Sequence, residues 1–454
     1  MAGFNYRTAF GVWINDMRNT GMPREPWPYP ILDEQAEKDI INCVRLQSEA
    51  GYNIFTVWGL LSTWGWPCDI ISSVTTERRE RVDRIIKAAH DNGMKIITGV
   101  GVYSWGFDEI VKHYPEVAGN NPHAMCASKD ASWKWMKKII DFVLTEFPGL
   151  DGIHMESADL GRCSCELCSK YQDIEYHAKI NIMVADYVKQ NYPAKIVMSS
   201  TCGFSRILAE EELNALSEMT KHIDYLIFPR LIEEPRYADP VKRKEFISRI
   251  HCDFGSSGGF WIYPPQRWDR MRWFLPHPKS TGENIKELYD DGGRAIEYYM
   301  GPSVNPSTEF NIFFGGVILS DPEKTIEQAA SESIRHLYKP NDEITCEKLA
   351  KIFMDAEHAY ISNCAVEMPR IGEIRLQKLF QIDCDDPKYL TFHEDHNIQF
   401  MTGKGRKGYK DALENIMERV GGIEDKVGEP DKIRRIELCI TNVIQDLTQL
   451  GFEN

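Results

Sequence analysis

The chain alternates short, strand-like apolar runs with longer amphipathic segments. Its first 320 residues contain eight runs rich in Val, Ile, Phe, Tyr and Trp, the residue types that favour β-strands. Most of these runs are nearly continuous in apolar residues, which is typical of strands buried on both faces of a parallel sheet. The predicted strands lie at about residues 6–15, 53–59, 94–103, 150–156, 194–200, 222–229, 258–264 and 294–300.

Segments of helical length separate these strands. Apolar residues recur at the 3.6-residue spacing of an α-helix in residues 34–50, 76–92, 131–147 and 169–191. Alternation of strand and helix predicts a parallel sheet covered by helices, and eight repeats favour a closed barrel over a doubly wound sheet. No GxGxxG motif follows a strand, so a Rossmann fold would lack its phosphate loop. We therefore predict an α/β fold, a (βα)8 TIM barrel.

The strand pattern stops near residue 320. Helical patterns then cover residues 323–337, 343–362, 408–420 and 431–450. We predict a catalytic barrel over residues 1–320 and an α-helical C-terminal region over residues 321–454. The apolar faces of these helices either pack on the side of the barrel or form a homodimer interface, and the pattern does not choose between the two.

Composition narrows the class of protein. Among the 454 residues, 43% are hydrophobic, and no window reaches the roughly 18 uninterrupted apolar residues of a membrane span. The net charge of −15 disfavours nucleic acid as a partner, because neutralising phosphates requires a basic face. The N-terminal sequence MAGFNYRTAFGVW has neither the basic segment nor the apolar segment of a secretory signal, so we expect a cytoplasmic protein. We also expect most of its 12 cysteines to be reduced thiols.

The stretch from residue 150 to residue 168, LDGIHMESADLGRCSCELC, carries the main catalytic candidates. Barrel enzymes build their active sites at the C-terminal ends of the strands, and Glu156 ends the fourth predicted strand. A carboxyl held at an apolar strand end can have a raised pKa and so act as a general acid. His154 points to the same side of the strand, where it would orient the acid. The structural alternatives are a glutamate paired with arginine and a histidine that belongs to the core.

Aromatic and polar residues gather at the predicted strand ends and in the loops beside them. Rings flanked by polar groups suit a sugar, whose apolar face stacks on an aromatic ring while its hydroxyls form hydrogen bonds. For any single aromatic residue, filling the core is the competing interpretation. The candidates for substrate binding are Asp16, Trp58, Trp64, Tyr103, Trp105, Arg230, Tyr263, Trp268 and Tyr299.

The segment that begins at Asn121 reads NPHAMCASKDASWKWMKKIIDFVLTEFPGLDGIHMESADLGRCSCELC. It resembles the catalytic-strand region of glycoside hydrolase barrels related to the family 20 hexosaminidases and the family 67 α-glucuronidases. It is most similar to the bacterial relatives of these families. A weaker resemblance covers GGRAIEYYMGPSVNP and the helix after it. The resemblance implies a glycosidase of carbohydrate metabolism whose general acid maps onto Glu156. Hexosaminidases have an aspartate directly before this acid; Met155 stands there instead, and Asp159 in the following loop is the candidate to replace it.

Glycoside hydrolysis usually needs a second carboxyl, either a nucleophile or a base that activates water. The predicted seventh strand, WIYPPQRW, contains no carboxylate, so Glu297 is the leading candidate and Asp16 the next. We therefore predict a glycosidase that acts on the non-reducing end of small glycans and requires no cofactor. Arg230 would clamp the carboxylate if the sugar is a uronic or sialic acid.

Cys163, Cys165 and Cys168 form a C-x-C-x-x-C motif in the loop after the candidate acid. Three thiolates so close together supply most of a tetrahedral zinc site, with His123, Cys126 or Cys202 as the fourth ligand; a loop of reduced thiols is the simpler interpretation. A structural zinc would brace the active-site loop. The remaining alternatives are a metal-dependent hydrolase or lyase that uses this loop, and a carbohydrate-binding barrel without catalytic activity.

Overall fold

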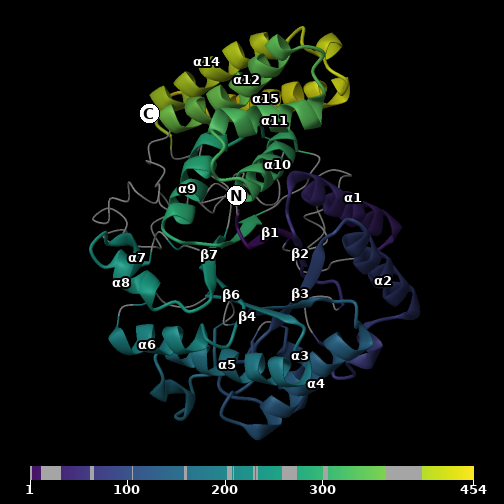
Figure 1. Ribbon diagram of the computed structural model, residues 1–454, viewed down its shortest axis with the longest axis vertical. Coiled ribbons are helices and arrows are strands. Elements are labelled where there is room, and N and C mark those ends of the chain that lie inside the picture. The colour runs from purple at the N-terminus through teal and green to yellow at the C-terminus, as the bar shows by residue number, and fades with distance from the viewer. Residues whose placement is uncertain are drawn as a thin grey trace.

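A computed structural model describes most of the chain. The described residues are 3–11, 32–61, 66–104, 106–157, 161–201, 207, 209–228, 231, 234–257, 273–299, 305–363 and 401–453. Within them lie all the elements that form the barrel and the C-terminal helices shown in Figure 1.

Eight parallel strands form a closed barrel in chain order, because β8 pairs with β1. This confirms the predicted (βα)8 fold. Seven predicted strands coincide with observed ones, although most observed strands are shorter than predicted. The strands are β1 (Tyr6–Gly11), β2 (Ile54–Val57), β3 (Lys95–Gly101), β4 (Gly152–Glu156), β5 (Ile196–Ser200), β6 (Tyr225–Phe228), β7 (Asp253–Ser257) and β8 (Ala295–Tyr299).

Helices surround the barrel (Figure 1) and begin at residues suited to that position. The Asp33 carboxylate accepts a hydrogen bond from the Ala36 backbone N–H at 2.7 Å, and Thr75 caps the second helix in the same way. The helices are α1 (Glu34–Ala50), α2 (Thr76–Asp91), α3 (Asp108–His113), α4 (Asp130–Glu146), α5 (Asp173–Asn191), α6 (Glu210–Met219), α7 (Pro235–Ala238), α8 (Arg243–Ser248), α9 (Pro278–Asp290) and α10 (Pro306–Ser320).

The interior of the barrel divides into an apolar part and a polar part. Alternate residues of each strand face inward, so the register fixes which side chains meet there. One buried cluster contains Ile54, Ile97, Ile196, Met198, Tyr225, Ile227 and Ala295. Further along the same inward faces, towards the C-terminal ends of the strands, stand His154, Glu156 and Glu297. The apolar part closes the barrel beneath a small group of buried ionisable side chains.

The seventh strand was predicted in the wrong place. β7 occupies Asp253–Ser257, whereas the predicted run, residues 258–264, lies outside the described part of the chain. The sequence of β7, DFGSS, has too little apolar character to be recognised as a buried strand. Close packing against β8 explains the glycine in this strand, because a β-carbon at Gly255 would lie 1.6 Å from the Ala295 carbonyl oxygen. The close approach of the β7 and β8 backbones thus requires glycine in this strand, and a pattern of hydrophobic residues along the sequence does not reveal such an approach.

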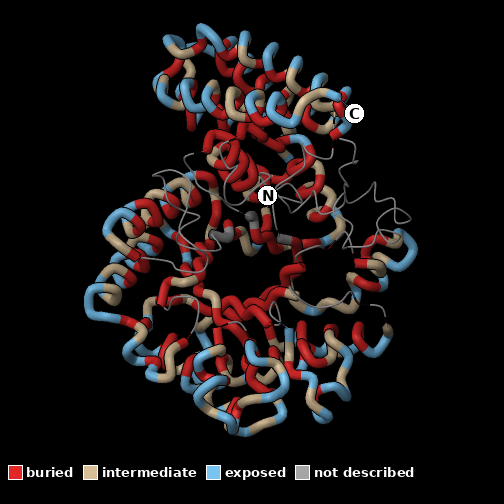
Figure 2. Tube along the Cα trace, turned by 180° about the vertical axis from the view of Figure 1, so that it is seen from behind, coloured by how far each residue is buried: buried red, intermediate tan, exposed pale blue. Residues whose placement is uncertain are grey.

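The C-terminal helices are α11 (Ile326–Tyr338), α12 (Glu343–Asn363), α14 (Gly403–Val420) and α15 (Pro430–Leu450). They pack against α9 and α10, which separate them from the barrel (Figures 1 and 2). The Glu357 carboxylate accepts hydrogen bonds from two backbone N–H groups in the first turn of α9, and Asp446 accepts one from the Trp273 indole at 2.7 Å. Buried polar contacts thus fix these helices to the barrel side. The division at residue 320 and the homodimer stay predictions.

No helix in the described ranges is both long enough and apolar enough to cross a lipid bilayer.

The close approach of β7 to β8 gives a first prediction. Gly255→Ala should lower the free energy of unfolding by about 3 kcal/mol, because the added methyl group forces two paired strands apart. Gly421→Ala is the matched control, since a β-carbon there would have its nearest neighbour at 3.3 Å, and we expect a change within about 0.5 kcal/mol. Thermal unfolding of the two variants measures the difference. Equal melting temperatures would contradict the packing argument.

Candidate active site

β4 delivers two side chains into the barrel. Every residue of β4 is buried, and Gly152, His154 and Glu156 alternate along its inward face. Glu156 is the last residue of the strand, as predicted, and pairs in register with Gly101, the last residue of β3. The predicted acid therefore stands at the C-terminal end of its strand, where barrel enzymes hold their catalytic groups.

The structure brings His154 between two carboxyl groups. Its Nε2 atom lies 3.7 Å from Oε2 of Glu156, and its Nδ1 atom lies 3.5 Å from Oε2 of Glu297. Glu297 comes from β8, on the opposite side of the ring of strands. The side chains of His154, Glu156 and Glu297 are 1%, 10% and 4% exposed. We call these three residues the carboxylate–imidazole group.

Burial sets the charges of this group. Removal from water lowers the pKa of His154 to about 3 and raises the pKa of Glu297 to about 8. Near neutral pH the imidazole is therefore uncharged and the Glu297 carboxyl carries a proton. A neutral imidazole has one N–H donor and one bare nitrogen acceptor, so it can face a carboxylic acid on one side and a carboxylate on the other.

Trp58 and Gly99 hold the imidazole from one side. The indole of Trp58 meets the His154 ring edge to face, with the ring centroids 5.2 Å apart and an interplanar angle of 76°. A β-carbon on Gly99, which pairs in register with His154, would lie 1.9 Å from an indole carbon. Glycine at this position lets the indole lie across β3. Trp58 is buried, and its predicted role in sugar binding stays a prediction.

Tyr103 follows the end of β3 in a strained backbone conformation. Its φ angle is 62°, in the left-handed region that residues with a β-carbon rarely adopt. The side chain is buried, and its pKa is raised by burial and, to a smaller extent, by the Cys126 thiol. The phenol therefore lies near Cys126, and its predicted contact with a substrate stays a prediction.

A buried polar network supports the end of β4, and the sequence analysis missed it. Ser157, the residue after Glu156, shares a 2.8 Å hydrogen bond with Nδ1 of His177. Asn181 donates to the Ser157 hydroxyl at 3.1 Å and accepts from the Ser199 hydroxyl at 3.1 Å. His177 and Asn181 lie four residues apart on α5 and thus on one helix face, which was the available signal. The network fixes the backbone beside the candidate acid.

Several predicted site residues lie outside the described part of the chain, and the side chain of Tyr299 at the end of β8 does too. The residues concerned are Asp16, Trp64, Trp105, Asp159, Arg230, Tyr263 and Trp268. Their predicted roles stay predictions.

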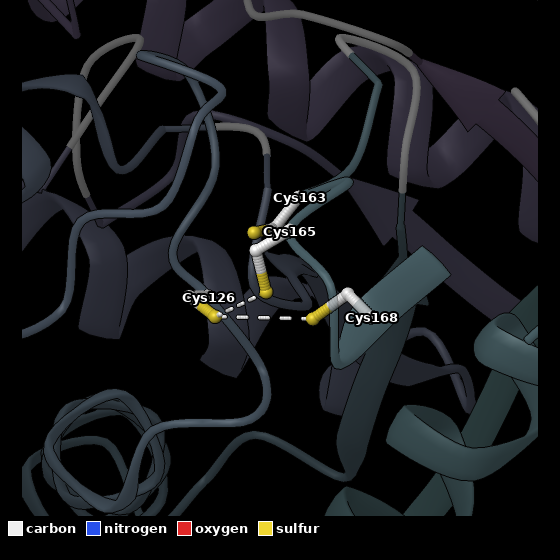
Figure 3. Close-up of side chains that lie close together, drawn as sticks. All are labelled: Cys126, Cys163, Cys165 and Cys168. Carbon is white, nitrogen blue, oxygen red and sulfur yellow. Dashed lines mark hydrogen bonds between the residues drawn. The ribbon is translucent and has the colours of Figure 1, made fainter. Parts of the chain in front are cut away.

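The structure brings Cys163, Cys165 and Cys168 together with Cys126, which comes from the segment between α3 and α4 (Figure 3). His123, one of the candidates for a fourth ligand, instead pairs with Asp108 through Nδ1 at 2.5 Å. Cys202 lies in a segment that the structure does not describe. Of the two candidates that the structure describes, Cys126 lies beside the motif and His123 does not.

Comparison with known proteins supports the fold. No family model and no curated protein matches the chain. One similar solved structure is a GH138 enzyme targeting pectin rhamnogalacturonan II, with a TM-score of 0.61, 10% identity, and coverage of 98% of this chain and 57% of that one. Another is a mutant of the Thermobaculum terrenum O-GlcNAc hydrolase, with a TM-score of 0.55, 11% identity, and coverage of 98% and 83%.

These structural neighbours are glycoside hydrolases, and they share the barrel fold with this chain. The chain spans little more than half the length of the GH138 enzyme. The narrower resemblance to families 20 and 67 stays a prediction.

The raised pKa of Glu297 predicts a pH-dependent stability. Between its ordinary value of 4.5 and about 8, the folded chain holds a proton that the unfolded chain has lost, so the free energy of unfolding falls as the pH rises through this range. The side-chain amide of the Glu297→Gln variant cannot ionise, so this variant does not lose stability for this reason as the pH rises. Because one pKa unit corresponds to about 1.4 kcal/mol, the variant should gain several kcal/mol over wild type between pH 5 and pH 9.

Melting temperatures of wild type and Glu297→Gln across this pH range measure the effect. Glu347→Gln, an exposed change on α12, is the control and should follow wild type. A constant difference between wild type and Glu297→Gln would show that Glu297 ionises normally in the folded chain.

Proposed function

We propose that this protein is a glycoside hydrolase that removes a sugar from the non-reducing end of small glycans, with Glu156 as its general acid. The observation that carries the proposal is the carboxylate–imidazole group at the end of a closed barrel. Hydrolysis of a glycosidic bond needs one carboxyl that protonates the leaving oxygen and a second that attacks or activates water. The names of the structural neighbours support the same class of reaction.

The depth of the two carboxyls supports action on a terminal sugar. Glu156 and Glu297 are both nearly inaccessible, and both face the interior of the barrel rather than its outer surface. A sugar at the end of a glycan can enter a barrel mouth as a single ring. A residue in the middle of a polymer needs an open groove that accepts chain on both sides. Burial of the reacting groups therefore favours the exo-acting enzyme.

Glu297 is the source of the proton that Glu156 donates. Glu297 begins protonated, since burial raises its pKa to about 8, and Nδ1 of His154 is the ring nitrogen that faces it. When Nδ1 accepts this proton, Nε2 releases its own to Glu156. The transfer leaves Glu156 as an acid, Glu297 as a carboxylate and His154 neutral in its other tautomer. The N···O distances of 3.5 and 3.7 Å must shorten by roughly 0.6 to 0.8 Å to reach the usual hydrogen-bond length of about 2.9 Å, as catalytic hydrogen bonds often do when substrate binds.

This exchange prepares both carboxyls for the reaction. Glu156 protonates the glycosidic oxygen as the bond to the anomeric carbon breaks through an oxocarbenium-like transition state. Glu297, now ionised, attacks that carbon or takes a proton from the attacking water. His154 transfers the proton without acquiring a net charge, which suits a group whose pKa burial lowers to about 3.

The proposed acid predicts a dependence on the leaving group. Wild type should hydrolyse one member of a panel of aryl hexosaminides, uronides and sialosides. Glu156→Gln should lose about 10³-fold in kcat/KM on the phenyl glycoside of that sugar, because phenolate leaves poorly without a proton. The loss should be much smaller on the dinitrophenyl glycoside, whose leaving group needs little protonation. Steady-state rates on the two substrates give this comparison.

Glu347→Gln is again the control and should keep wild-type rates on both substrates. Equal losses by Glu156→Gln on both leaving groups would assign Glu156 a role other than acid. A wild-type protein that hydrolyses no member of the panel would contradict the proposed function.

A further inference from the structure

Four cysteines converge from two loops that follow neighbouring strands. Cys126 comes from the loop between α3 and α4, which follow β3, and Cys163, Cys165 and Cys168 come from the loop between β4 and α5. All four sulfur atoms lie within 4.8 Å of one another, and all four thiols are free (Figure 3). We call these four residues the cysteine cluster.

The sulfur separations match a shared metal ion. Sγ of Cys126 lies 3.7 Å from Sγ of Cys165 and 3.8 Å from Sγ of Cys168. Four sulfurs placed tetrahedrally at the Zn–S distance of about 2.3 Å stand about 3.8 Å apart. A disulfide would bring two sulfurs to about 2.05 Å. Two of the six sulfur separations therefore equal those expected around one ion, and the others are within 4.8 Å.

The donor set selects the kind of ion. Four thiolates suit a soft or borderline cation and exclude calcium and magnesium, which take oxygen ligands. Four protein ligands also fill a tetrahedral coordination sphere and leave no position for a substrate. We infer that Cys126, Cys163, Cys165 and Cys168 bind one zinc ion in a closed, structural site. The inference does not depend on the proposed glycosidase function.

Contacts around the cluster hold the two loops in this arrangement. A β-carbon on Gly119 would lie 2.3 Å from Sγ of Cys163, so glycine permits the loops to approach this closely. The Asn120 carboxamide accepts a hydrogen bond from the Ser164 backbone N–H at 2.8 Å and donates one to the Ser164 hydroxyl at 2.9 Å. One side chain of the first loop thus binds both the backbone and the side chain of Ser164 in the second.

A single arginine orders the rest of the cysteine-rich loop. The Arg162 guanidinium donates to the backbone carbonyls of Cys168 and Tyr171, each at 2.9 Å, and pairs with Asp173 at the start of α5. It also lies over the Tyr176 ring, 4.7 Å from the centroid. These contacts bend the loop back on itself, so that Cys163 and Cys168 face the same point.

The zinc ion would connect the loops that flank the carboxylate–imidazole group. The backbone N–H of Met125, next to Cys126, donates a hydrogen bond to the carbonyl of Tyr103, two residues after the end of β3. The three other cysteines follow Glu156 and Ser157 at the end of β4. One ion therefore fixes the chain that leaves β3 to the chain that leaves β4. If the proposed function is correct, this cross-link braces one wall of the active site.

Metal analysis of the full chain tests the inference. Protein purified without a metal-affinity step or chelator should contain one zinc ion per chain by mass spectrometry of the metal. Cys126→Ser and Cys165→Ser should lower this content at least fivefold. Cys346→Ser is the matched control and should keep the full zinc content, because Cys346 is buried away from the cluster and donates to the Ser331 carbonyl, a bond that serine preserves.

A second measurement uses wild type alone, in case the cluster variants fail to fold. Replacing zinc by Co²⁺ should give the intense sulfur-to-cobalt charge-transfer bands and the visible bands of a tetrahedral tetrathiolate site. A metal-free wild type whose reduced form gives no such spectrum with Co²⁺ would overturn the inference, and so would a disulfide among the four residues in the intact mass. Iron in place of zinc would overturn the choice of ion. None of these results depends on enzymatic activity.

Discussion

Exclusion of water from the barrel interior is the constraint on which the chemistry of this protein depends. The closed ring of parallel strands leaves no edge through which solvent reaches the inward faces, and apolar side chains fill its lower part. Three ionisable groups, His154, Glu156 and Glu297, stand directly above that apolar part. Because burial penalises charge, it keeps His154 neutral and Glu297 protonated. In water, His154 and Glu297 would each titrate near their ordinary pKa values.

Much of the surrounding structure holds this group in place. On one side, Gly99 lets Trp58 lie across β3 and support the imidazole. Behind β4, the hydrogen-bonded network around His177 fixes the residue after Glu156. Beyond the strand ends, the cysteine cluster ties together the two loops that continue from β3 and β4. Ring packing, hydrogen bonds and the cysteine cluster thus lie around the same short section of the barrel.

The sequence predicts the parts of this architecture that depend on local pattern. The alternation of strand-like and helix-like segments predicts the barrel. Glu156 becomes a candidate because it is a carboxylate at the end of a buried strand. Local pattern fails where contacts between distant segments decide. β7 depends on the approach of Gly255 to Ala295, and the pairing of Glu297 with His154 joins strands on opposite sides of the ring. Neither relation leaves a periodic signal in the chain.

The cysteine cluster shows the same limit. The C-x-C-x-x-C motif identifies three of its members, but spacing along the chain does not distinguish Cys126 from His123 or Cys202 as the fourth. The fold decides between the two described candidates, because it places Cys126 beside the motif while His123 pairs with Asp108. The strained backbone of Tyr103 likewise follows from the path of its loop and from no property of tyrosine. Tertiary contacts supply what composition and periodicity leave open.

Burial places a proton on Glu297 and leaves His154 uncharged at neutral pH. Neutron diffraction from deuterated crystals at neutral pD locates these protons directly. We predict a deuteron on the Glu297 carboxyl and a deuteron on only one of the two nitrogens of His154. A doubly deuterated, positively charged His154 between two ionised carboxylates would contradict it.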